Sequence, residues 1–242
     1  MQEKIKVITI GDYNISILKN YFKDNENIEF LKLALDESID NLNTNFSKRD
    51  IVFLRTNAEN LEKLLEVGKA LKEKEIITVT ILEEKLAIEN KEVLENSIDT
   101  IFPVNKKDDI ENLFLELIKM IYNIIFERCY INLDVEDVKY MLKDSGISVF
   151  GSLNINKTIS KEDIIKNINY PFYNKTLKDS RKLLVFLDTL KGFVFTEGEL
   201  ITDTLRNESG KTIEDMLFSI RMANRLKNRI ECSFIAGLFK ER

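Results

Sequence analysis

The sequence Ile131-Asn132-Leu133-Asp134-Val135-Glu136-Asp137-Val138 carries an Asn-x-Asp-x-x-Asp motif between two predicted helices. A long apolar helix is predicted before it, over 109–126, and an amphipathic helix after it, to about Leu142. The first of two explanations for the motif is helix initiation, with Asp134 as N-cap and Asp137 three residues later. Acidic side chains are favoured there because the helix dipole is positive at that end. A chemical role for the same carboxylates is the other explanation.

The long helix before the motif has apolar side chains around much of its circumference. Glu111, Glu116 and Lys119 interrupt this surface, which favours a helix buried between two layers over a membrane span. Its apolar positions are Ile110, Leu113, Phe114, Leu117, Met120, Ile121, Ile124 and Ile125. Tyr122, Phe126 and Tyr130 continue the same spacing and are predicted to be core residues.

The N-terminal half alternates short apolar runs with helical patterns. Such alternation predicts a parallel sheet covered by helices. The predicted strands are 4–10, 28–35, 51–54, 76–81 and 100–102, and the predicted helices are 14–22, 61–71 and a segment near 89–95.

The last third mixes strands and helices in the order of a small α+β domain. The predicted strands are 147–150, 182–187, 216–221 and 229–235, with helices near 161–167 and 198–207. Both helices are predicted to begin with a capping box, formed by Ser160 with Asp163 and by Thr196 with Glu199. The chain is therefore divided into 1–107, a central helix and connection over 108–130, and 131–242.

Composition excludes several classes of protein. The formal charge is -5, from 36 basic and 41 acidic residues, which argues against a nucleic-acid partner. The sequence has no run of eighteen uncharged apolar residues, and a strand-like segment stands where a signal peptide would, so a soluble, cytoplasmic protein is expected.

Histidine is absent, and Cys129 and Cys232 are the only cysteines. Imidazole bases, Ser-His or Cys-His pairs and clustered metal ligands are thereby excluded, and no metal site is predicted. Both cysteines are predicted to be buried free thiols. Any catalysis would depend on carboxylates, lysines or backbone dipoles.

Several motifs occur in the order found in FtsZ, the bacterial tubulin homologue. The segment 134–139 resembles the Asp-Phe-Ala-Asp-Val-Lys/Arg of its synergy loop, and 145–152 resembles its Gly-Tyr-Ala-x-x-Gly-Ser. Lys191-Gly192-Phe193 after a strand is similar to Ala-Gly-Phe, and 234–237 is similar to the terminal Val-Ala-Thr-Gly strand. The resemblance implies a tubulin/FtsZ-like α/β fold: a Rossmann-like parallel sheet, a long buried central helix and a smaller α+β domain.

The sequence departs from that family at each GTP-binding loop. The Gly-rich turn after the first strand is replaced by Gly11-Asp12-Tyr13-Asn14, and the Gly-Gly-Gly-Thr-Gly-Thr/Ser-Gly signature by 55–61, which has no glycine. Small residues let backbone amides converge on phosphate, so Gly11 is at most a vestige of the cradle. Glu59 and Glu62 would repel an anion there. Arg55 could partly compensate for the lost cradle, but a lone arginine is more often a solvated surface residue, which is the expectation here.

Base recognition is altered as well. The resemblance places Asn112 where the central helix of FtsZ carries an acidic residue that pairs with guanine, and an amide lacks that charge. The ribose-side Asn-Thr-Asp is replaced by Leu33-Ala34-Leu35-Asp36. No cofactor is therefore expected, and Gly11 and Asn112 are the only vestigial nucleotide-binding candidates.

In FtsZ filaments the synergy loop projects into the GTP site of the neighbouring subunit, where its aspartates polarise the attacking water. By resemblance, Asn132, Asp134 and Asp137 would be catalytic residues donated to a neighbour. The leading hypothesis is a divergent FtsZ-like cytoskeletal or cell-division protein, a pseudo-GTPase that contacts an FtsZ-like filament or itself through the Asp134–Asp137 face. Direct membrane binding is not expected, because 237–242 lacks the FtsZ linker and terminal peptide.

Two other functions remain open. An active GTPase that assembles into filaments would use GTP and magnesium through unconventional phosphate contacts. A plain α/β scaffold would be indifferent to nucleotide and to FtsZ.

Overall fold

The computed structural model describes residues 3–42, 44–105, 109–156, 160–170, 176–210, 212–224, 226–227 and 229–237. Two compact units emerge from its contacts. Unit 1 is Met1–Glu116 with Leu142–Ile147, and unit 2 is Leu117–Met141 with Ser148–Arg242. Helix α5 (Ile110–Phe126) contributes residues to both units.

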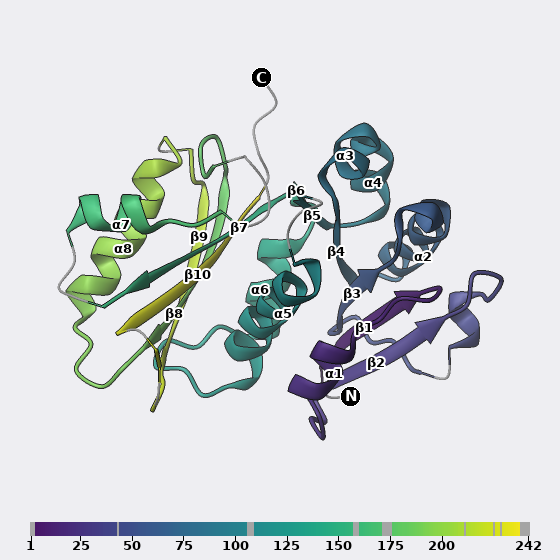
Figure 1. Cartoon of the computed structure of the whole chain (residues 1–242), viewed down its shortest axis with the longest axis horizontal. Helices are drawn as coiled ribbons and strands as arrows, with labels where there is room; N and C mark the ends of the chain where they lie inside the picture. Colours follow the sequence, from purple (N-terminus) through teal and green to yellow (C-terminus); the bar gives the residue numbers. More distant parts are fainter. Residues whose placement is uncertain are drawn as a thin grey trace. The chain divides into compact units, whose positions relative to one another are not determined.

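Unit 1 contains a six-stranded parallel sheet in the order β2-β1-β3-β4-β5-β6 (Figure 1). The strands are β1 (Ile5–Ile10), β2 (Ile28–Leu33), β3 (Ile51–Arg55), β4 (Ile77–Glu83), β5 (Thr100–Val104) and β6 (Gly146–Ile147). The helices are α1 (Ser16–Tyr21), α2 (Leu61–Glu73), α3 (Glu84–Glu89) and α4 (Lys91–Ser97), with short 3-10 turns at Ile39–Asn41 and Ala58–Asn60.

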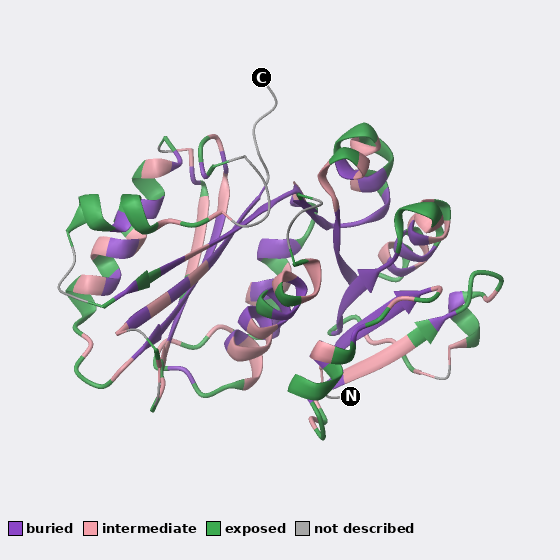
Figure 2. Ribbon diagram, viewed as in Figure 1, coloured by how far each residue is buried: buried purple, intermediate pink, exposed green. Residues whose placement is uncertain are grey.

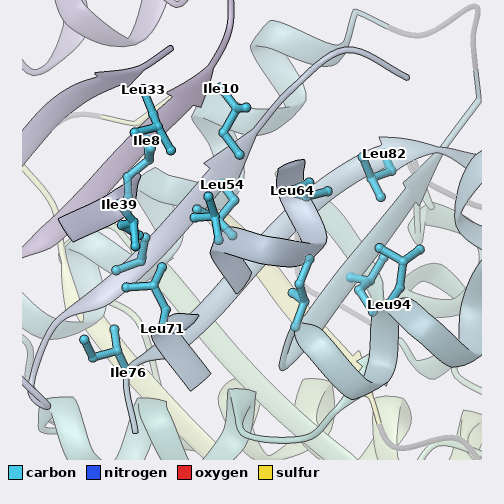
Figure 3. Close-up of a cluster of buried hydrophobic side chains, with 14 of the residues drawn as sticks. Ile8, Ile10, Leu33, Ile39, Leu54, Leu64, Leu71, Ile76, Leu82 and Leu94 are labelled. Carbon is cyan, nitrogen blue, oxygen red and sulfur yellow. The ribbon is translucent and has the colours of Figure 1, made fainter. Parts of the chain in front are cut away.

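The central strands of unit 1 are buried on both faces, as their β-branched composition predicts. Every residue of β1, β3 and β5 is buried. Figure 2 shows these strands as buried and the outer faces of α2 and α3 as exposed. Figure 3 shows side chains of one core cluster, in which Ile8, Leu54 and Leu71 are buried together with Leu94.

Strand β1 carries a buried lysine, Lys6, whose ammonium group has hydrogen-bond and ion-pair partners within the chain. Lys6 is 2% exposed, and its ammonium donates to Glu29, 3.0 Å away, and to the carbonyl oxygen of Asn45, 2.8 Å away. Asp50 adds a second carboxylate at 3.7 Å. Paired charges of this kind compensate the desolvation of the ammonium.

Unit 2 contains a four-stranded mixed sheet in the order β7-β10-β8-β9, in which only the pair β8–β9 is parallel. Its strands are β7 (Val149–Ile155), β8 (Lys182–Thr189), β9 (Asp215–Met222) and β10 (Ile230–Gly237). Its helices are α6 (Val135–Leu142), α7 (Lys161–Asn167) and α8 (Phe195–Glu208). The last two lie on one face of the sheet (Figure 1).

One close approach fixes the packing of β7 on β10. Gly151 pairs with Phe234, and a Cβ atom at Gly151 would lie 2.0 Å from Cζ of the Phe234 ring. The ring therefore occupies the space that any larger residue at Gly151 would need.

The predicted α/β architecture, with its parallel sheet and smaller α+β part, is confirmed. Four details were wrong. Helix α3 was missed, the strand predicted over 147–150 is divided between β6 and β7, and α8 begins at Phe195. Ser160 and Asp163 form the predicted capping box, but the carboxylate that accepts at the start of α8 belongs to Glu197, not Glu199. No helix in the described part of the chain is long and apolar enough to cross a membrane.

Candidate functional site

The order of strands in unit 1 defines where a ligand would be expected. Strand β1 lies between β2 and β3, so the chain leaves β1 toward one side of the sheet and β3 lies on the other. Ligands of open parallel sheets bind at the carboxyl ends of the strands where the order reverses. Here that position lies after Ile10 and after Arg55, and we call it the switch point.

On the β1 side of the switch point, Gly11 makes a turn but no cradle. Its φ of +72° is left-handed, and its N–H donates to the carbonyl oxygen of Leu33 at 2.9 Å. A Cβ atom there would lie 3.0 Å from Nδ2 of Asn60. The loop continues through Tyr13, whose side chain is too large to leave room for converging amides.

On the β3 side, Arg55 is buried, with only 5% of its surface exposed, so the expectation of a solvated arginine was wrong. Its Nη1 donates to the carbonyl oxygens of Thr56 and Ile81, each at 3.0 Å. Its Nη2 donates to the hydroxyl of Tyr13, and Cζ lies 4.1 Å from the centre of the Tyr13 ring. The side chain thus joins β3, the end of β4 and the loop after β1.

This guanidinium forms no ion pair with a described residue, and its buried Nε has no hydrogen-bond partner among them. Burial lowers the pKa of Arg55, while Tyr13, Glu111 and Glu83 act in the opposite direction. A guanidinium remains charged in proteins, so the switch point holds an internal cation with its neighbouring carboxylates. It does not present an open amide cradle.

The helical segment that follows β3 offers little support for binding an anion. Neither Asn57 nor Asn60 caps a helix with its side chain. Glu59 is exposed in that first turn, and Glu62 is exposed one turn later. Their negative charge opposes the attraction that the helix dipole offers to phosphate.

Asn112 lies at the start of α5 and is exposed. Its backbone N–H donates to Asp109 at 3.2 Å, and its side-chain amide donates to the same carboxylate at 2.6 Å. The structure therefore places this residue in a local helix start. Its predicted role as the remnant of a guanine contact stays a prediction.

In unit 2, the Asn-x-Asp-x-x-Asp motif forms a reciprocal cap at the start of α6. The N–H of Asp137 donates to Oδ1 of Asp134 at 2.9 Å, and the N–H of Asp134 donates to Oδ2 of Asp137 at 3.1 Å. Asn132 accepts from the N–H of Cys129 at 3.0 Å. All three predicted site residues are thus together, and their local geometry is that of helix initiation.

Edge strand β9 holds the loop before this cap. The N–H groups of Tyr130 and Ile131 donate to the carbonyl oxygen of Ile220, at 2.6 and 3.3 Å, and Ile220 returns a bond to Ile131. Ser219 adds a hydroxyl bond to the carbonyl oxygen of Ile131 at 2.8 Å. Four hydrogen bonds therefore fix the entry to the motif before α6 begins. Tyr130 itself is 61% exposed, so the prediction that it belongs to the core was wrong.

The side chain of Arg221 links edge strand β9 to its neighbour β8 and to the segment before the motif. Arg221 on β9 donates to both oxygens of Asp188 on β8 and lies 3.9 Å from Glu127. The Asp188 carboxylate raises the pKa of Arg221, in spite of its partial burial.

The two cysteines are free and buried, as predicted. Burial raises the pKa of both Cys129 and Cys232, so neither is an activated thiolate. Within the described ranges, no group of three His, Cys, Asp or Glu side chains is arranged to hold a metal ion.

Reasoning from the sequence missed the pair of Tyr13 and Arg55. One signal was present, because Arg55 directly continues the apolar run Ile51–Leu54, and a residue in that register belongs to a buried strand. Its partner in the loop after β1 is distant in sequence, so only the fold brings the two together.

No family model matches this sequence, and no curated protein matches it. Solved structures do match. An empty FtsZ dimer from M. jannaschii is 14% identical with a TM-score of 0.73, covering 98% of this chain and 89% of that chain. GDP-form protofilaments of TubZ from Bacillus thuringiensis serovar israelensis are 11% identical with a TM-score of 0.66, covering 98% and 84%. TubZ of Clostridium botulinum phage c-st is 12% identical with a TM-score of 0.63, covering 99% and 93%.

Proposed function

We propose that this chain, which has the tubulin/FtsZ-like fold, is a divergent FtsZ-like cytoskeletal protein that does not bind GTP. It acts in the cytoplasm, in a process such as cell division, through contacts with an FtsZ-like filament or with itself. Its contact face includes Asp134 and Asp137. The proposal needs neither nucleic acid nor direct membrane binding.

The observation that carries the proposal is the buried Arg55 at the switch point. Its guanidinium already donates three hydrogen bonds to this chain, and the Tyr13 ring covers it. A bound phosphate would have to displace Tyr13 and lie close to Glu83 and Glu111, which act electrostatically on Arg55. Loss of the glycine cradle and gain of internal contacts together favour a site without nucleotide.

The Asp134–Asp137 cap is compatible with a role toward a partner. The cap uses Oδ1 of Asp134 and Oδ2 of Asp137. In the described part of the chain, the other oxygen of each carboxylate accepts no hydrogen bond, so each can accept one from a second protein. The similar TubZ structures are described as protofilaments and as a two-stranded filament, which supports assembly as the context.

Calorimetry with GTP and GDP in the presence of magnesium tests the proposal, together with an assay for nucleotide in a denatured extract of the purified protein. We expect no binding and no co-purified nucleotide. Binding at micromolar concentration or tighter overturns the proposal. The Arg55→Met variant is the matched control, because it removes the guanidinium from the switch point. Nucleotide binding by that variant alone would show that Arg55 keeps nucleotide out of the unaltered chain.

Partner contact is tested by adding the chain to an FtsZ and measuring GTP turnover of the mixture. The Asp134→Ala and Asp137→Ala variants should change that turnover less than the unaltered chain does. Binding with identical turnover for all three proteins would remove the catalytic role of the loop.

A GTPase that assembles by itself is the second candidate, favoured by the carboxylate oxygens of Asp134 and Asp137 that the helix cap does not use. It predicts magnesium-dependent GTP turnover whose rate per molecule rises with protein concentration. Loss of that turnover in Asp137→Ala, with binding retained, would establish it.

A further inference from the structure

Strand β2 lies at one edge of the parallel sheet of unit 1 (Figure 1). It spans six residues, Ile28–Leu33, whereas β6 at the opposite edge spans only two. In the described part of the chain, no strand pairs with β2 on the side away from β1. Proteins usually keep edge strands short or covered, because their unpaired peptide groups can bind another strand. The long edge of β2 is therefore a candidate interaction surface.

The peptide groups of β2 point alternately toward β1 and away from it. The N–H of Ile5 donates to the carbonyl oxygen of Asn27 at 2.9 Å, which shows that the odd-numbered residues face β1. The even-numbered residues of the strand therefore have outward peptide groups, and these are Ile28, Phe30 and Lys32. Within the described ranges, these three peptide groups have no hydrogen-bond partner.

A second copy of β2 can pair with the outward groups in the antiparallel direction, about a two-fold axis. Antiparallel residues exchange both of their hydrogen bonds only where their peptide groups point toward each other. All three outward residues are paired when Phe30 lies on the axis, so that Ile28 of each copy lies opposite Lys32 of the other. A shift by two residues leaves one of the three without a partner in β2. The geometry of the edge thus selects one register.

The charges at this edge favour the same register. Lys32 pairs with Asp12 at 2.6 Å, but its side chain remains 65% exposed and can reach a second carboxylate. Glu26, just before β2, is exposed and forms no ion pair with a described residue. In the antiparallel register each Lys32 is the diagonal neighbour of Glu26 in the other copy, on the same face of the sheet. Parallel pairing in register would instead place the two Lys32 ammonium groups side by side.

We propose that two copies of this chain pair along β2 and form a symmetric dimer with one continuous sheet. Phe30 is partly exposed, and the two Phe30 rings lie next to each other at the axis. Glu29, the other charged residue of β2, is engaged by Lys6 in its own copy at 3.0 Å and adds no unpaired charge. The inference goes beyond the proposed function, because β2 belongs to unit 1 and the Asp134–Asp137 face to unit 2.

Sedimentation equilibrium of the full chain without nucleotide tests the inference, from low micromolar concentration to the limit of solubility. The mass should rise from that of a monomer to that of a dimer. Phe30→Pro should abolish dimerisation, because proline removes the outward N–H on the axis, and an edge strand tolerates proline where the N–H faces solvent. Phe30→Val is the matched control, because it also loses the ring but keeps the N–H, and it should still dimerise.

Charge reversal gives a second test that leaves the peptide groups in place. Glu26→Lys and Lys32→Glu should each raise the dissociation constant about tenfold, because each places like charges next to each other across the axis. A chain that carries both changes should recover the affinity, and so should an equal mixture of the two single variants. Glu92→Lys, at an exposed position of α4, is the matched control and should have no effect.

Hydrogen exchange measured by NMR reports on the edge directly. The amides of Ile28, Phe30 and Lys32 should exchange freely in dilute protein and become protected as the dimer forms. A monomer at every concentration overturns the inference, and so does association that leaves these three amides unprotected or that ignores the charge reversals. Circular dichroism verifies that each variant is folded. None of these results depends on GTP, so the calorimetric test of the proposed function succeeds or fails separately.

Discussion

The guanidinium of Arg55 lies over the ring of Tyr13, with Cζ 4.1 Å from the ring centre, and donates a hydrogen bond to the Tyr13 hydroxyl. Two loops of unit 1 are thereby joined at the carboxyl edge of the sheet, where an open parallel sheet normally receives its ligand. A cation from the chain itself, stacked on an aromatic ring, stabilises this edge.

Replacement of Arg55 by Ala should lower the free energy of unfolding by about 2–4 kcal/mol, because a cavity forms and two buried carbonyl oxygens lose their donor. Tyr13→Phe should cost about 1 kcal/mol, since only the hydroxyl is lost. Urea unfolding measures both. Arg49→Ala removes an exposed pair with Glu3 and is the control, expected to cost under about 1 kcal/mol. Equal losses for Arg55→Ala and Arg49→Ala would contradict the structural role.

Replacement of Asp134 by Ser should distinguish the capping role of this side chain from any role of its negative charge toward a partner. Serine accepts the bond from the N–H of Asp137 about as well as aspartate does, so stability should change by less than about 0.5 kcal/mol. Asp134→Ala should lose about 1 kcal/mol. Thermal or urea unfolding gives these values, and turnover of an FtsZ mixture gives the effect on a partner. A functional carboxylate predicts that both variants lose the effect, whereas a purely capping residue predicts that Ser retains it.

The pair of Glu197 and Arg229 predicts a pH dependence of stability. The bond from Arg229 holds the pKa of Glu197 below its ordinary value of 4.5. The stabilisation is therefore complete above about pH 4.5 and disappears as the pH falls through the lower folded-state pKa. Glu197→Gln should cost about 1 kcal/mol at pH 7 and progressively less toward pH 2 in urea titrations. A cost independent of pH would show that the ionic pair contributes nothing.

Replacement of Gly151 by Ala should be among the most damaging single changes in unit 2. The added methyl group would lie 2.0 Å from the Phe234 ring, and overpacking of a core typically costs about 1–3 kcal/mol or more. Adding Phe234→Leu should recover part of this loss. Gly198→Ala on α8 is the control, because its nearest side-chain contact would be 3.1 Å and alanine favours the helix. Stability unchanged by Gly151→Ala would contradict the packing of β7 on β10.

The order of elements was predictable because it depends on short-range patterns. Every residue of strand β1 is buried, and helix α5 has one buried face from Phe114 to Ile124; apolar runs and spacing show both directly in the sequence. The cap at Asp134 and Asp137 was also predictable, since both partners lie within one helical turn. Helix α3 was missed because six residues are too few to display a helical period. The start of α8 was misplaced because Arg229, far away in sequence, engages Glu197.

By itself, the sequence determined the α/β layout, the absence of glycine from residues 55–61 and the start of α6, because each depends on residue type and local spacing. The tertiary structure alone decided that Arg55 is buried under Tyr13 and that Tyr130 is exposed against Phe195. Both outcomes depend on contacts between distant segments. The periodicity of a single strand or helix records which positions are apolar, but not which surfaces the fold finally covers.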